Sequence, residues 1–158
     1  MSRGKSLIAK HKLAPDPIHN SLILAKFVNH LMWDGKKSVA SRIVYDAFDI
    51  IEKKTGKKGL DVFSAAMKNV SPSVKVKSRR VGGANYQVPM EVKKDQKLMF
   101  AMKWVIAAVR AKKGRSTAEE LAEELMLASE AQGAAVKKKE DTHRMAESNR
   151  AYAHFARY

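Results

Sequence analysis

Basic side chains between Ser73 and Pro89 form the clearest chemical pattern in the sequence. Four bases occur in this stretch without any acid: Lys75, Lys77, Arg79 and Arg80. Lysine and arginine bind phosphate groups, while the following Gly82-Gly83 and Tyr86 permit close backbone approach and offer an aromatic face to a base. The pattern predicts a nucleic-acid contact, and it is also compatible with a solvated edge hairpin whose lysines discourage aggregation.

Further basic runs lie beside predicted turns and helix ends. They comprise Arg3, Lys5, Lys10 and Lys12, then Lys36 and Lys37, then Lys112, Lys113 and Arg115, and last Lys137, Lys138, Lys139, Arg144 and Arg150. The second run precedes a predicted helix, whose first N–H groups also favour a phosphate. One such run is more often a solvated face, but several beside turns together predict one extended basic face.

Catalytic and metal-binding patterns are missing from the sequence. The chain has no cysteine, and none of its histidines shows metal-ligand spacing: His11, His19, His30, His143 and His154. Gly35-Lys36-Lys37-Ser38 resembles the end of a P-loop, but His30 stands where the earlier glycine is required. The acids Glu119, Glu120, Glu123 and Glu124 are expected to form a solvated helix face. We therefore expect no enzymatic activity, no cofactor and no metal.

Hydrophobic periodicity predicts a mainly α-helical domain of about six helices with a protruding two-stranded β-hairpin arm. Helical spacing occurs at about 21–34, 38–55, 60–70, 95–113, 116–132 and from 135 past His143, and period-two spacing occurs from 73 to 92 around a glycine turn. Asn20 or Ser21, Asp95 and Ser116 are expected to cap helices. Trp33 and Trp104 are expected in the core. We expect one domain over 1–158, with a basic N-terminal arm at 1–19 and the hairpin arm at 73–92.

The net charge of the chain is +15, from 31 lysines and arginines and 16 acids. Such a charge implies an anionic partner, either nucleic acid or an anionic membrane surface. The longest apolar run, 104–109, is too short to span a bilayer, so we expect a cytoplasmic protein without membrane association. Residues 116–132 contain five acids and no base, and this segment is expected to face away from RNA or toward a basic neighbour.

Three stretches of the sequence resemble the bacterial-type family of ribosomal protein number seven of the small subunit. They are 34–38 with 43–48, 77–83 with 87–89, and 133–147 with 149–154. The resemblance covers residues 15–155 and implies a helical domain with a β-arm. It further implies a structural protein that binds the 3′ major domain of 16S-type rRNA and nucleates assembly of the subunit head. Such a protein lies near the exit-site tRNA and the mRNA, and touches small-subunit proteins nine and eleven.

The resemblance also implies roles for individual residues. It assigns rRNA contact to Lys36, Lys37, Lys77, Arg79, Arg80, Lys137, Lys138, His143 and Arg144, joined by Arg3, Lys5, Lys10, Lys12, Lys112, Lys113 and Arg115. The basic pattern of the hairpin adds Lys75 to these rRNA contacts. It places Val81, Gly82, Gly83, Ala84, Asn85 and Tyr86 near tRNA. Two alternatives stay open on the residues alone: a DNA-architectural protein with a basic β-arm, and an enzyme acting on nucleic acid.

Overall fold

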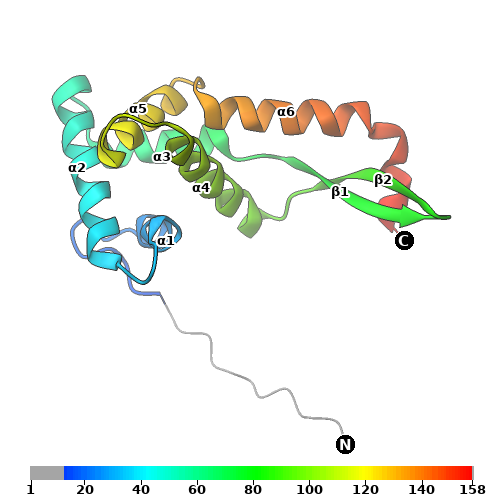
Figure 1. Cartoon of the computed structure of the whole chain (residues 1–158), viewed down its shortest axis with the longest axis horizontal. Coiled ribbons are helices and arrows are strands. Elements are labelled where there is room, and N and C mark those ends of the chain that lie inside the picture. Colours follow the sequence, from blue (N-terminus) through cyan, green and yellow to red (C-terminus); the bar gives the residue numbers. More distant parts are fainter. Residues whose placement is uncertain (1–12, 158) are drawn as a thin grey trace, which may run out of the picture.

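The computed structural model describes residues 13–157, which contain six α-helices, one β-hairpin and one 3-10 helix (Figure 1). In chain order the elements are α1 (Leu22–Leu31), α2 (Lys37–Thr55), α3 (Gly59–Val70), β1 (Val74–Val81), β2 (Ala84–Glu91), α4 (Lys94–Ala111), α5 (Thr117–Ser129), α6 (Ala134–Ser148) and η1 (Arg150–Arg157). The predicted mainly α fold with one hairpin is confirmed. The sequence pattern did not predict η1.

The core lies where α1 to α5 meet, and α5 is its central element. α5 packs against α2, α3 and α4, and its Leu121 and Leu125 are fully buried. Phe27 of α1 and Phe63 of α3 meet edge to face with their ring centroids 5.2 Å apart, a geometry that aromatic pairs favour. Each helix thus buries the apolar face that its sequence period created, and this burial is the main favourable term in folding.

Two of the three predicted helix N-caps are present in the structure. The Ser21 hydroxyl accepts the N–H of Leu24 at the start of α1, and the Ser116 hydroxyl accepts the N–H of Glu119 at the start of α5. The cap expected at Asp95 is wrong, because α4 already begins at Lys94 and has no side-chain cap. Asp95 lies instead in the first turn, where an acidic side chain interacts favourably with the helix dipole.

The hairpin is regular from its base to its tip. β1 and β2 pair antiparallel from Val74 opposite Glu91 to Val81 opposite Ala84. Gly82 and Gly83 form the turn with φ values of +56° and +89°. A two-residue turn of this kind needs positive φ at both positions, which glycine adopts without strain.

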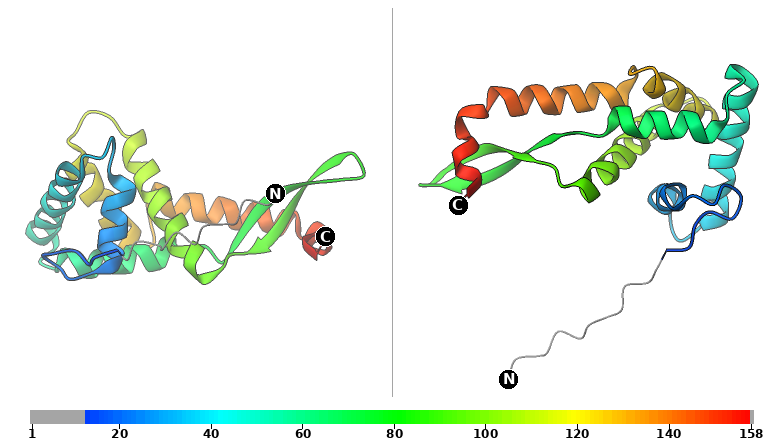
Figure 2. Two further views of the ribbon diagram at one scale, coloured as in Figure 1. Left: turned by 90° about the horizontal axis from the view of Figure 1, so that it is seen from below. Right: turned by 180° about the vertical axis from the view of Figure 1, so that it is seen from behind.

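The hairpin projects away from the helical core, and the C-terminal elements accompany it (Figure 1). α6 runs alongside it and contacts both strands, and η1 packs against β2 (Figure 2). Within the two strands only Val88 is buried, opposite Lys77 about halfway along the hairpin, and Val92 is buried just beyond β2. A two-stranded ribbon is marginal by itself, so these contacts with the helices stabilise it.

The prediction that both tryptophans lie in the core is wrong for Trp33. Trp104 is half-buried against the core on α4, with its ring 5.9 Å from that of Phe100. Trp33 instead lies in the loop between α1 and α2 and is 65% exposed. α1 ends at Leu31, before the apolar pattern does, and this turns the indole outward.

Candidate nucleic-acid interface

The bases of β1 lie on both faces of the hairpin. Because side chains alternate along a strand, Lys75, Lys77 and Arg79 share one face, and Arg80 lies on the other. Lys77 and Arg80 are exposed, and Arg79 is half-buried. The projecting ribbon therefore presents a cation to solvent on each face, so phosphates could contact it from two sides.

Lys75, near the base of the hairpin, is turned toward α4. Its Nζ donates a hydrogen bond of 2.9 Å to Oε1 of Gln96 and lies 5.6 Å from the centroid of the Phe100 ring. These contacts connect β1 to α4 and fix the direction in which the hairpin leaves the core. Lys75 therefore has a structural role in addition to the phosphate contact expected of it.

The hairpin tip is open to solvent, but the aromatic ring beside it is partly covered. Gly82 and Gly83 are exposed, as are the two residues that follow them. Tyr86 is half-buried, because the rings of Tyr152 and Phe155 in η1 lie 5.1 and 5.2 Å from its own ring. The stacking face expected at Tyr86 is thus engaged by the C-terminal segment of the same chain.

α6 carries two of the predicted cations in an open position. Lys137 and Lys138 are exposed near its N-terminal end. Lys139 points back to the core, where its Nζ donates a hydrogen bond of 2.6 Å to the carbonyl oxygen of Asn69. Arg144 is exposed, and its Nη1 lies 3.8 Å from Oδ1 of Asp141.

His143 connects α6 to the start of the hairpin. Its Nε2 accepts the backbone N–H of Ser73 at 3.2 Å, so this nitrogen is unprotonated in that contact. Burial, and then the positive charge of Lys139, lower the pKa of His143 below its usual value. This contact joins α6 to the residue that precedes β1, and the rRNA contact expected of His143 stays a prediction.

The loop between α1 and α2 supplies a second open pair of cations. Lys36 precedes α2 and Lys37 begins it, and both are exposed. No side chain caps this helix, although the N–H of Lys37 donates to the carbonyl oxygen of Gly35 at 2.9 Å. The N–H groups of the first turn that have no such partner lie beside the two ammonium groups. This arrangement confirms the predicted position of both lysines at a helix N-terminus.

The three bases between α4 and α5 differ sharply in their surroundings. Nζ of Lys112 lies 3.5 Å from Glu120 Oε2 and 3.4 Å from Glu124 Oε2. Arg115 pairs with Glu123 at 2.9 Å. Only Lys113 is exposed without an ion pair inside the described part of the chain. Two of the three expected phosphate ligands are therefore already engaged by acids of α5.

The prediction of a fully solvated glutamate face on α5 is wrong for two of its members. Glu124 is fully buried and Glu120 is 6% exposed, because α5 is the central helix of the core. Oε1 of Glu124 accepts the N–H of Ala135 at 2.9 Å and so satisfies a donor at the start of α6. The ammonium group of Lys112 lies beside both carboxylates, and its single positive charge balances one of the two negative charges.

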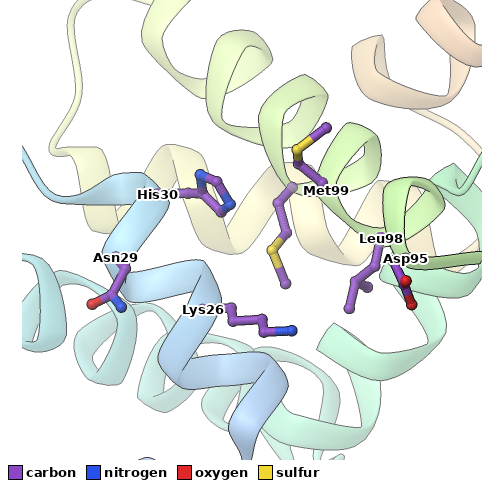
Figure 3. A pocket seen from close by; sticks show the side chains of 7 residues that line it. Lys26, Asn29, His30, Asp95, Leu98 and Met99 are labelled. Carbon is purple, nitrogen blue, oxygen red and sulfur yellow. The ribbon is translucent and has the colours of Figure 1, made fainter. Parts of the chain in front are cut away.

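A hollow of about 330 Å³ between α1 and α4 brings together residues that the sequence reasoning missed (Figure 3). Lys26, Asn29 and His30 approach it from α1, and Asp95, Leu98 and Met99 from α4. Burial, followed by the charge of Lys103, lowers the pKa of His30. Lys26 and Lys103 belong to no basic run, so only helical spacing, such as the i, i+4 relation of Lys26 and His30, could have indicated a shared face.

The elements that carry the predicted cations lie toward different ends of the molecule, and the single extended basic face stays a prediction. α6 lies beside the hairpin, whereas the loop between α1 and α2 lies toward the opposite end of the long axis (Figure 1). The N-terminal bases Arg3, Lys5, Lys10 and Lys12 lie outside the described residues.

The described part of the chain contains neither a metal-binding cluster nor a membrane-spanning helix. Across residues 13–157, no three histidine, aspartate or glutamate side chains gather closely enough to hold a metal ion. Among the helices of this range, none combines the length and the apolar character that crossing a bilayer requires.

Comparison with known sequences places the chain among ribosomal proteins. The family profile described as Ribosomal protein S7p/S5e matches residues 2–150. The chain is 53% identical over 146 residues to small ribosomal subunit protein uS7 of Thermotoga maritima, which covers 92% of this chain and 94% of the relative. It is 54% identical over 148 residues to uS7 of Desulforamulus reducens, with 94% and 95% covered. For uS7 of Syntrophomonas wolfei the identity is 52% over 151 residues, with 96% and 97% covered.

Proposed function

Since this chain belongs to the Ribosomal protein S7p/S5e family, we propose that it is a structural constituent of the small ribosomal subunit that binds 16S-type rRNA. The proposal includes binding of the 3′ major domain and nucleation of head assembly. It also includes a place near the exit-site tRNA and the mRNA, with contacts to small-subunit proteins nine and eleven. Family membership supports these points, and the arrangement of basic side chains supports the rRNA contact in particular.

The projecting hairpin is the observation that carries the rRNA proposal. Its exposed Lys77 and Arg80 lie on opposite faces of a ribbon that extends beyond the core, and the exposed Lys137 and Lys138 belong to the helix that runs beside it. A rigid basic ribbon can follow folded RNA by shape while its cations bind phosphates. The contacts of Lys75 and His143 at its base supply that rigidity.

The DNA-architectural alternative is less well supported by the hairpin. Proteins of that class insert an apolar or proline wedge between base steps in order to kink the duplex. Pro89 is the only proline in the hairpin, and it pairs opposite Val76 near the base rather than at the tip. A competition experiment separates the two functions, because preference for bent duplex DNA over structured RNA would favour the alternative.

A salt titration tests the phosphate contacts. Arg79→Ala combined with Arg80→Ala removes one cation from each face of the ribbon. We expect the negative slope of log K against log salt for an rRNA fragment to become shallower by about 2. Lys53→Ala with Lys54→Ala makes the same charge change at the exposed C-terminal end of α2, away from the hairpin, and should leave the slope unchanged. An unchanged slope in the arginine variant would show that Arg79 and Arg80 do not contact phosphates.

A further inference from the structure

Trp33 is a large aromatic side chain that the fold holds at the surface. The side chain is 65% exposed, yet its indole is held in position, because the guanidinium carbon of Arg110 lies 4.8 Å from the ring centroid. Nη2 of Arg110 also donates a hydrogen bond of 3.1 Å to the carbonyl oxygen of Leu31. Arg110, from the end of α4, therefore ties the indole to the last residue of α1 and orients it while leaving most of it open.

A hollow of about 430 Å³ lies against this indole. Its apolar wall consists of Leu31, Val39, Ala40 and Ile43, and Lys36 and Arg110 add two cations beside Trp33, with Thr117 completing the lining. None of these eight described residues is acidic. The volume lies within the range of about 300–1,000 Å³ that is typical of ligand sites.

The chemistry of the hollow fits a planar, anionic ligand. An apolar wall and an oriented indole favour an aromatic ring that can stack, and the two cations favour a negative charge attached to that ring. A nucleotide of single-stranded RNA has both properties in one unit. An apolar peptide side chain would use the wall but would bring no negative charge to Lys36 and Arg110, and the lining itself contains no acid.

We propose that Trp33 stacks on an unpaired base of the rRNA to which this protein binds, while Lys36 and Arg110 contact the neighbouring phosphates. The inference rests on the proposed function and adds a base-reading position to it. Lys37 and the uncapped N-terminus of α2 lie next to the hollow and extend the phosphate-binding surface. Such a site would select a looped-out base, because stacking on a side chain requires a base that has left the helix.

Tryptophan fluorescence makes this site directly observable. The chain has two tryptophans, so Trp104→Phe leaves Trp33 as the only one, and Trp33→Phe leaves only the half-buried Trp104 as the matched control. On titration with a transcript of the 3′ major domain of 16S-type rRNA, we expect emission to be quenched in the Trp104→Phe protein. We also expect Trp33 to become protected from acrylamide. Emission of the Trp33→Phe protein should change little.

Affinity measurements supply the second part of the test. Trp33→Ala should weaken binding of the same transcript by about 5- to 150-fold, the effect that removal of a base-stacking aromatic produces. It should leave the salt slope unchanged, because no charge is lost, whereas Lys36→Ala should reduce the slope by about 1. Trp33→Phe retains a stacking ring and should recover part of the affinity. Since Trp33 is mostly exposed, thermal melting should show that Trp33→Ala folds normally.

The outcomes separate this inference from the proposed function. If wild-type protein binds the transcript but Trp33 emission and acrylamide access stay constant at saturation, the stacking proposal is overturned. Unchanged affinity of Trp33→Ala would overturn it as well. Failure of the wild-type protein to bind the transcript would refute the proposed rRNA contact itself, and the stacking site with it.

Discussion

Replacing Lys112 by methionine should lower the free energy of unfolding by about 3 kcal/mol. Its ammonium group is the shared partner of two carboxylates, at 3.5 Å from Glu120 and 3.4 Å from Glu124. The carboxylate side chains are 8% and 1% exposed, so the lysine substitution leaves two charges in the core that water cannot solvate. Breaking a buried pair typically costs about 3–5 kcal/mol, and the 30% exposure of the lysine side chain places this case at the lower end.

Urea unfolding measures this cost, with a matched control on the same pair of helices. Arg115→Met breaks the ion pair between Arg115 and Glu123, which is shorter at 2.9 Å but has side chains 61% and 39% exposed. Solvent-exposed pairs contribute about 0–1 kcal/mol, so the control should lose no more than that. For a chain of this length, the expected loss in Lys112→Met corresponds to a fall in Tm of about 6–12 °C.

A second substitution distinguishes unpaired charge from lost packing. In the Lys112→Met background, Glu120→Gln removes one of the two unpaired carboxylate charges. It should restore at least about 1 kcal/mol of the free energy of unfolding. In the wild-type background the same change leaves Lys112 paired with Glu124 and should have a smaller effect. If Lys112→Met loses less than about 1 kcal/mol, or if Glu120→Gln restores nothing, the reasoning from buried charge is refuted.

Three further predictions concern packing, the hairpin tip and alkaline pH. Gly59→Ala should cost about 1–3 kcal/mol in urea unfolding, because a Cβ there would lie 2.5 Å from Cβ of Phe48; a loss near zero would contradict this. Tyr86→Ala should speed hydrogen exchange in η1, whose aromatic rings lose their partner; unchanged exchange would show that η1 is held by other contacts. Burial first, then the hydrogen bond to Asp16 and its charge, raise the pKa of Tyr45 from 10.0 to about 12. Because the folded state favours the protonated Tyr45 hydroxyl, this side chain contributes to the free energy of unfolding. That contribution is complete below about pH 10 and is lost as the pH rises through about 12. Tyr45→Phe should remove one late-ionising tyrosine from an alkaline absorbance titration, and an unaltered late phase would contradict that assignment.

Local signals in the sequence were sufficient to predict the helices and the β-hairpin of the fold. Helical and strand periods, the serine caps at 21 and 116 and the glycine turn at 82–83 each depend on a few neighbouring residues. They predicted the helices and the hairpin, but the short 3-10 helix η1 was not predicted. Family motifs likewise occupy short continuous stretches, so the family could be identified before any packing was known.

The candidate interface was predicted less completely, because exposure of a charge is decided by packing between distant elements. Lys77 and Lys137 are open as expected, but Lys112 and Arg115 are engaged by glutamates of the next helix. His143 accepts a hydrogen bond from a residue 70 positions earlier in the chain, which no spacing rule anticipates. Residue type therefore named the candidates, and tertiary contacts decided which of them face solvent.

The sequence by itself determined that this protein is helical, carries a basic β-hairpin, belongs to a ribosomal family and needs an anionic partner. The helices, the hairpin and the anionic partner follow from local period, turn chemistry and net charge, and the family follows from short sequence motifs; none of these depends on how the helices pack. Only the tertiary structure decided that Glu124 is a buried structural acid and that Trp33 is an exposed indole oriented by Arg110. The physical reason is that the free energy of a charge or an aromatic ring depends on its solvent exposure, and helices far apart in the chain set that exposure jointly.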